Sequence, residues 1–193
     1  MTNLEIFKQV EEHPFEKGFL SSGEAVIDRR HKRIVDAVEG CGHICEFGPG
    51  NGKLGVYFIS KGIPVSFVDI SRERLRDFYT HIGDEVSVPC FVYSEPWELR
   101  FLPDDGFGAV IAAEVIEHVK DWKRLIVEMI RIARKKVVIT TPVGESFWDP
   151  GHKHFFEKSD FDFLDNFTIE EIITKEGDKQ TGNRCYLVEI DTR

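Results

Sequence analysis

Apolar and polar positions along the chain follow two alternating patterns. Short continuous apolar runs bounded by glycines or turn residues predict buried strands, and apolar positions that recur every three or four residues predict amphipathic helices between them. The predicted strands span residues 43–47, 65–70, 88–93, 107–113 and 136–141, and the predicted helices span residues 24–38, 53–60, 72–81 and 122–133. Ser71 and Asp121 are placed to cap the last two of these helices.

Two further apolar stretches, residues 167–175 and 184–191, follow each other without a helix between them. The joining segment, EGDKQTGN, is rich in turn residues, so we expect an antiparallel hairpin. Strands that alternate with helices and end in a hairpin predict an α/β fold. We expect a doubly wound, mostly parallel, seven-stranded sheet with a C-terminal antiparallel hairpin.

A chain of 193 residues suits one domain, so residues 1–193 are expected to form a single unit. Residues 1–39 would form an N-terminal helical cap. One face of its helix carries Val26, Ile27, Arg30, Ile34, Val35 and Val38. Residues 142–158 show no clear periodicity but contain four aromatic side chains, and long loops of this kind in compact domains are usually functional. We expect this loop to cover an active site.

Composition and charge narrow the classes of function. The net charge of −9 argues against a large nucleic-acid surface, and the dense basic cluster DRRHKR at residues 28–33 is interpreted as the solvated side of a helix. No apolar run is long enough to span a membrane and the acidic N-terminus does not resemble a secretory signal, so we expect a cytoplasmic protein. The four cysteines lack a C-x-x-C pair and are expected to be buried free thiols.

The segment Cys45–Gly55, CEFGPGNGKLG, concentrates four glycines directly after the first predicted strand. Glycine lets the backbone approach a ligand closely, and the following helix offers N–H groups that its own carbonyls do not bond. The spacing is G-x-G-x-G after an acid, Glu46. It lacks the hydroxyl residue of a phosphate-binding P-loop, because Leu54 follows Lys53, and it lacks the third glycine of a dinucleotide fingerprint.

This segment resembles the first motif of class I S-adenosylmethionine-dependent methyltransferases. The resemblance extends over residues 40–160 and is closest to small single-domain members of the quinone-biosynthesis O-methyltransferase-like type. Asp69 matches the family's acid on the ribose hydroxyls, and Glu95 matches the acid near the adenine. Arg100 and Gly108 depart from the family pattern, in which proline and aspartate are more usual. The cofactor-binding residues that the resemblance implies are Glu46, Gly48, Gly50, Gly52, Asp69, Glu95 and Glu114.

The chemistry of these residues agrees with S-adenosylmethionine as the cofactor. The sulfonium is cationic and the molecule carries no phosphate, so a corner with acids suits it better than it suits a pyrophosphate. Carboxylates also form charge-assisted hydrogen bonds with ribose hydroxyls.

The sequence EVIEHV places Glu114, Glu117 and His118 directly after the fourth predicted strand. In a helical turn these positions would share one face and could bind Mg²⁺ or another divalent cation, with His152 or His154 as a further ligand. Small-RNA 3′-terminal ribose 2′-O-methyltransferases hold a metal with such a motif. In other family members the turn shapes the cofactor pocket or supplies a base. A metal site, a base and a purely structural turn are therefore all open alternatives.

We expect a methyltransferase that acts on an oxygen or nitrogen of a small-molecule acceptor. Its catalytic residues would be His118, Glu117 and His154, with His118 as the base. The metal site, where one exists, would consist of Glu114, Glu117, His118 and His154. Alternative functions are metal-assisted ribose 2′-O-methylation of RNA 3′ ends, a non-catalytic cofactor-binding module and a nicotinamide-dependent oxidoreductase. Because the chain is acidic, we expect a small-molecule acceptor rather than a nucleic acid.

Overall fold

The computed structural model describes residues 27–82, 88–144, 149–174 and 184–192. Its helices are α2 (Arg29–Ala37), α3 (Lys53–Ser60), α4 (Arg72–Ile82) and α5 (Trp122–Ile132), with short 3-10 helices η1 (Pro96–Phe101), η2 (Ile116–His118) and η3 (Lys158–Phe161). Its strands are β1 (Ile44–Phe47), β2 (Val65–Asp69), β3 (Cys90–Val92), β4 (Phe107–Ala113), β5 (Ala133–Pro142), β6 (Phe167–Ile173) and β7 (Arg184–Asp191). Residues 1–26 of the expected cap, residues 145–148 of the expected loop and the predicted turn at 175–183 lie outside the described residues.

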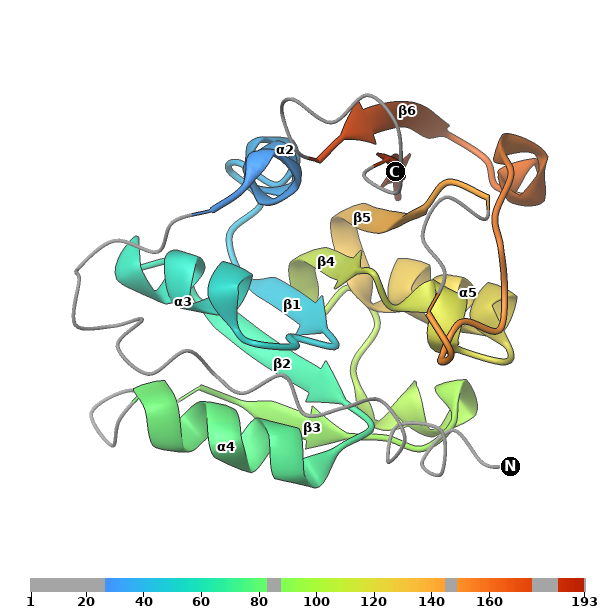
Figure 1. Ribbon diagram of the computed structural model, residues 1–193. Coiled ribbons are helices and arrows are strands. Elements are labelled where there is room, and N and C mark those ends of the chain that lie inside the picture. The colour runs from blue at the N-terminus through green and yellow to red at the C-terminus, as the bar shows by residue number, and fades with distance from the viewer. Residues whose placement is uncertain (1–26, 83–87, 145–148, 175–183, 193) are drawn as a thin grey trace.

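The strands form one seven-stranded sheet in the order β3-β2-β1-β4-β5-β7-β6 (Figure 1). The strands from β3 to β5 are parallel to one another, whereas β7 is antiparallel to both β5 and β6. The predicted fold class and the predicted hairpin are confirmed. Phe47 at the end of β1 lies opposite Val68 and Ala112, so the carboxyl ends of β1, β2 and β4 share one edge of the sheet. Ligands of open α/β sheets bind at this edge.

Helices cover both faces of the sheet, which explains why the central strands are continuous apolar runs. On one face α2, α3 and α4 pack through buried residues such as Ile34, Leu54 and Phe78. On the other face α5 packs through Leu125 and Met129. Figure 1 shows α3 and α4 grouped along the β1–β3 half of the sheet and α5 beside β4 and β5.

Local caps set where the helices begin. The Ser71 hydroxyl accepts a hydrogen bond of 3.2 Å from the Arg74 N–H, and Asp121 caps α5 in the same way. Both caps were predicted. Asp28 caps α2 by accepting a bond of 2.9 Å from the His31 N–H, so within the described residues this helix begins at residue 29 rather than at residue 24.

β5 begins directly after α5, at Ala133, rather than at residue 136 as predicted. The extension pairs Ala133 with Phe107, and the register shifts between Phe107 and Ala109. Gly108 lies at this shift, where a Cβ would approach Cys41 O to 1.7 Å. No larger residue fits there, which explains the glycine at a position where the family pattern favours aspartate.

Three expectations from composition can be compared with the structure. Arg29 and Lys32 are exposed as predicted, but Arg30 is directed inward, with its side chain 21% exposed and paired with Glu114. All four cysteines are free and three of them are buried. Within the described part of the chain, no helix has both the length and the apolar character needed to cross a bilayer.

Candidate active site

Three glycines shape the loop between β1 and α3. Gly48, Gly50 and Gly52 have φ angles of 58°, 55° and 76°, in the left-handed region, where other residues pay roughly 1–2 kcal/mol each. The Gly48 N–H donates to Val68 O at 2.8 Å, which ties the loop to β2. A Cβ on Gly48 would also approach Val115 Cγ2 to 2.7 Å. The loop therefore presents bare backbone at the carboxyl edge of the sheet, directly before the N-terminus of α3.

Glu46 lies in β1 just before this loop. The residue is 3% exposed, and its Oε2 atom has no hydrogen-bond partner among the described residues. Oε2 lies 3.1 Å from the position that a Cβ on Gly55 would take, so the carboxyl is packed against α3. Burial raises the pKa of Glu46 to about 8, which keeps the carboxyl mostly protonated at neutral pH.

Asp69 is the last residue of β2 and is 4% exposed. Its Oδ1 atom accepts a hydrogen bond of 2.7 Å from the Ser71 N–H, and its backbone oxygen accepts one of 3.2 Å from the Tyr93 N–H. Burial raises the pKa of Asp69 to about 6, so the carboxylate is mostly ionised at neutral pH. An oriented, ionised carboxylate beside the glycine loop is the chemistry that a ribose diol requires.

Glu95 follows β3, the neighbour of β2, and directly precedes η1. It is half-buried and makes no side-chain cap. Glu98 closes this turn instead, because its Oε2 atom accepts a hydrogen bond of 2.7 Å from the Ser94 N–H. The Glu95 carboxylate is thus not committed to capping, and Glu95 follows the strand that pairs with the one carrying Asp69.

The turn after β4 differs from the predicted one. Glu114 has a φ of 56° and is not helical, and η2 begins only at Ile116. The expectation that Glu114, Glu117 and His118 share one face of a helical turn is therefore wrong. The Glu114 N–H donates to Thr140 O at 2.9 Å, and its Oε1 atom lies 3.4 Å from Arg30 Nη1 on α2.

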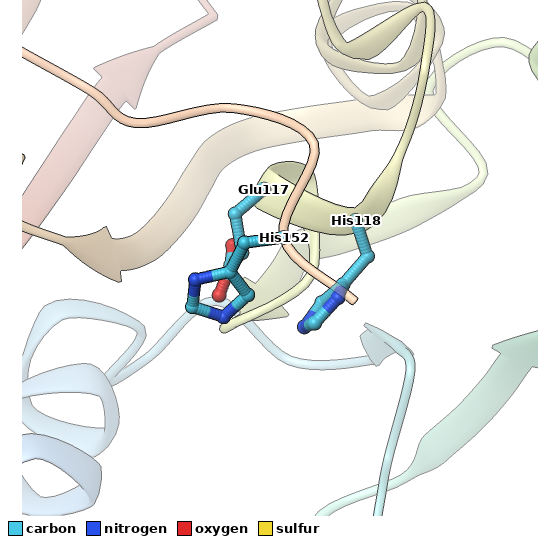
Figure 2. A group of neighbouring side chains, drawn as sticks. All are labelled: Glu117, His118 and His152. Carbon is cyan, nitrogen blue, oxygen red and sulfur yellow. The ribbon is translucent and has the colours of Figure 1, made fainter. Parts of the chain in front are cut away.

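A trio of side chains does gather beside this turn: Glu117, His118 and His152, whose potential ligand atoms all lie within 4.8 Å of one another. Figure 2 shows Glu117 and His118 descending from η2 and His152 reaching them from the loop after β5. Glu117 is 1% exposed; its Oε2 atom accepts a hydrogen bond of 3.2 Å from Thr141 Oγ1, and its Oε1 atom has no hydrogen-bond partner among the described residues. Burial, and then the charge of Glu114, raise the pKa of Glu117 well above its usual value.

The loop after β5 orients the His118 ring. His118 Nδ1 lies 3.0 Å from Gly151 O; a carbonyl only accepts, so Nδ1 carries the proton and Nε2 carries the lone pair. Burial lowers the pKa of His118, which keeps the ring neutral at pH 7. The His152 ring stands edge-on to it, with 4.8 Å between the ring centroids. The loop is held there by Lys153 N–H, which donates to Glu117 O at 2.8 Å.

His154, the histidine predicted as a catalytic residue and metal ligand, is not in the trio. Its ring lies beside Trp122 and Phe156, and its Nε2 atom is buried without a hydrogen-bond partner among the described residues. His152, which the sequence offered as the alternative metal ligand, lies beside Glu117 and His118 instead. Sequence reasoning missed Thr141 and Gly151, because their contacts with the trio join segments that are distant in the chain.

The donor set of the trio fits a divalent transition metal. One carboxylate and two imidazoles match the two-histidine, one-carboxylate group that binds such ions with open positions. The Gly151 carbonyl and the Thr141 hydroxyl supply the outer hydrogen bonds that usually orient metal ligands. Atoms bound to one ion at about 2.1 Å lie roughly 3–4 Å apart, so small side-chain shifts would suffice.

Comparison with known proteins identifies the family. A model of the methyltransferase domain family matches residues 19–163. Two solved structures of S-adenosylmethionine-dependent methyltransferases share the fold. The one from Archaeoglobus fulgidus is 17% identical, with a TM-score of 0.65, over 84% of this chain and 91% of that chain. The one from Aquifex aeolicus is 13% identical, with a TM-score of 0.64, over 100% of both chains. No curated protein matches the chain.

A structure from Rhodobacter sphaeroides described as a putative Zn-dependent alcohol dehydrogenase is also similar, with 11% identity and a TM-score of 0.68 over 98% of both chains. Likeness at this identity shows the fold alone and does not distinguish methyl transfer from nicotinamide chemistry. The family model identifies a methyltransferase domain, and its match covers the glycine loop, Asp69 and the trio. The chain therefore belongs to the methyltransferase domain family and is a class I S-adenosylmethionine-dependent methyltransferase.

Proposed function

We propose that the enzyme methylates a hydroxyl oxygen of a small-molecule acceptor, and that the acceptor binds at Glu117, His118 and His152. The observation that carries the proposal is the neutral His118 ring, whose Nε2 lone pair is fixed by the bond from Nδ1 to Gly151 O. A hydroxyl must lose its proton to become a good nucleophile, whereas a neutral amine already has its lone pair. An oriented neutral imidazole therefore suits oxygen better than nitrogen as the acceptor atom.

The cofactor would lie along the carboxyl edge of β1, β2 and β3. We assign the ribose hydroxyls to Asp69, the adenine side to Glu95, and the close backbone contact to the loop of Gly48, Gly50 and Gly52. Glu46 and Glu114 border the same edge. S-adenosylmethionine supplies a methyl group bonded to cationic sulfur, which makes that carbon electrophilic.

The chain's own residues would then position and deprotonate the acceptor. His118 Nε2 would accept the hydroxyl proton, and S-adenosylmethionine, when bound, would supply the methyl group to the oxygen. Positioning the acceptor hydroxyl for the transfer would supply most of the rate. The loop residues around Gly151 lie against His118 and would help to exclude water.

A second route uses a divalent cation at the trio. Its support is the fit of Glu117, His118 and His152 to such an ion, together with the buried Oε1 atom of Glu117 that lacks a partner among the described residues. A bound cation would lower the pKa of the acceptor hydroxyl directly, so that no protein base is needed. This route would also serve a ribose hydroxyl at an RNA 3′ end, and RNA therefore belongs in the acceptor screen.

Two measurements test the proposal. Calorimetric titration with S-adenosylmethionine should give binding heat, and a screen of phenols, catechols, alcohols and short RNAs with methyl-labelled cofactor should identify an acceptor. His118→Asn should then reduce turnover by about 100-fold or more while the cofactor affinity is retained. His43→Gln is the matched control, because His43 precedes β1 at the opposite edge of the sheet.

The outcomes separate the two routes. Loss of turnover in EDTA, restored by Mg²⁺ or Mn²⁺, would support the cation, whereas turnover unaffected by EDTA would support His118 as the base. No binding heat at high micromolar cofactor would count against the assigned cofactor site. Full activity of His118→Asn together with insensitivity to EDTA would exclude both routes.

A further inference from the structure

We propose that Arg30 acts as a latch on Glu114, so that the cation site of the trio gains Glu114 as an additional ligand only when Arg30 releases it. The inference rests on the cation route of the proposed function and adds to it the residue that controls the ligand set. It concerns helix α2, which the catalytic scheme above does not use.

Arg30 reaches the site from α2, on the same helix side as the buried Ile34 and Val38. Its side chain is 21% exposed, and Nη1 lies 3.4 Å from Glu114 Oε1. The contact is a loose ion pair, because the 3.4 Å separation includes no hydrogen bond: neither Arg30 Nε nor Glu114 Oε1 has a hydrogen-bond partner among the described residues. A bidentate arginine–carboxylate pair would be much stronger, so this contact is open to exchange.

Glu114 is a further carboxylate close to the trio, because its charge acts on the Glu117 carboxyl. It stands three positions before Glu117 in the chain, and the charges of both Glu114 and Arg30 act on the Glu117 carboxyl. Glu114 is nevertheless outside the group of atoms within 4.8 Å that defines the trio. Its left-handed backbone, with φ of 56°, sets the start of its side chain, and the ion pair directs its end toward α2.

A divalent cation and the Arg30 guanidinium are alternative counter-ions for Glu114. At separations of a few ångströms in a partly buried site, the two positive charges repel each other and weaken the binding of the cation. Removing the charge of Arg30 should therefore strengthen cation binding in two ways: it removes the repulsion and it frees Glu114 as a ligand. A purely structural ion pair would instead affect only the attachment of α2.

The test measures Mn²⁺ binding to the full-length protein by electron paramagnetic resonance, without any acceptor. Arg30→Met should bind Mn²⁺ at least about tenfold more tightly than the wild type. Glu114→Gln in the Arg30→Met background should abolish that gain. Arg33→Met is the matched control, since Arg33 is on the same helix and forms an ion pair with Glu170 on β6. It should leave Mn²⁺ affinity unchanged.

Arg30→Gln provides a second variant that keeps a polar side chain, and thermal unfolding shows which of the two variants is folded. Unchanged or weaker Mn²⁺ binding in the folded variant would overturn the latch. Mn²⁺ binding by neither the wild type nor the variant would overturn it as well. S-adenosylmethionine binding, measured by calorimetry on the same samples, separates these failures from a failure of the proposed function, because it does not require the cation.

Discussion

The Oδ1 atom of Asp69 accepts a hydrogen bond of 2.7 Å from the backbone N–H of Ser71. This bond closes the turn between β2 and α4 and fixes the carboxylate at the carboxyl edge, next to the glycine loop. The orientation does not depend on any ligand. In the proposed cofactor site, Asp69 would therefore accept hydrogen bonds from the ribose without a further loss of side-chain entropy.

Cofactor affinity should depend on pH through Asp69. Burial raises the pKa of its carboxyl to about 6, and only the ionised form is a pure acceptor for two ribose hydroxyls. We expect constant affinity above about pH 7 and a fall of up to about tenfold per pH unit below pH 6. Calorimetry between pH 5 and 8 measures this. Asp69→Asn should bind about tenfold more weakly at pH 8 and lose this acid-side fall. The exposed Asp77→Asn should behave as the wild type, and an equal pH dependence in Asp69→Asn would refute the assignment.

Gly50→Ala should weaken cofactor binding more than it weakens the fold. Gly50 has a φ of 55°, and a Cβ there would meet only Gly48 O, at 3.9 Å, so the protein itself has room for it. The expected loss in stability is about 1–2 kcal/mol from the left-handed backbone. Gly62→Ala is the control, because Gly62 has a φ of 69° in open space after α3. Both variants should lose similar stability in urea, and only Gly50→Ala should lose about tenfold or more in cofactor affinity. Equal affinities would show that the ligand does not approach this backbone.

Glu46 should make the protein less stable as the pH rises. Burial raises the pKa of its carboxyl from 4.5 to about 8, so the folded state keeps a proton that the unfolded state releases. Its effect is absent below about pH 4.5, grows by up to about 1.4 kcal/mol per pH unit, and is complete above pH 8. Glu46→Gln cannot ionise and should show a flatter dependence of the free energy of unfolding on pH. Urea unfolding at pH 5, 6, 7 and 8 measures the two slopes, and identical slopes would contradict the buried neutral carboxyl.

Arg131 should be the main anchor of η1, the turn that follows Glu95. Its guanidinium donates to Leu99 O and Leu102 O, both at 2.9 Å, and pairs with the buried Glu128. Arg131→Met leaves these acceptors without their donor and should lower the free energy of unfolding by about 2–4 kcal/mol. Arg134→Met, at an exposed position two residues into β5, should change it by less than about 0.5 kcal/mol. Comparable stability of the two variants in urea would show that η1 is held by other contacts.

Local chemistry explains which predictions from the sequence were correct. The strands β1, β2 and β4 are buried on both faces and appear in the sequence as short apolar runs. Such a run can be recognised without knowing which strands pair with it. Ser71 and Asp121 cap helices through bonds to N–H groups three residues further on. The glycine loop is also local, because the left-handed φ angles of Gly48, Gly50 and Gly52 belong to the turn itself.

The arrangement of the candidate site was decided only by the tertiary structure. His152 and His154 are equivalent in the sequence, but the bonds from this loop to Glu117 O turn His152 toward His118 and leave His154 beside Trp122. Glu114 departs from the predicted helical turn and pairs with Arg30 of α2. These outcomes depend on contacts between segments that are far apart in the chain, and such contacts leave no mark in hydrophobic periodicity, which records only the burial of neighbouring positions.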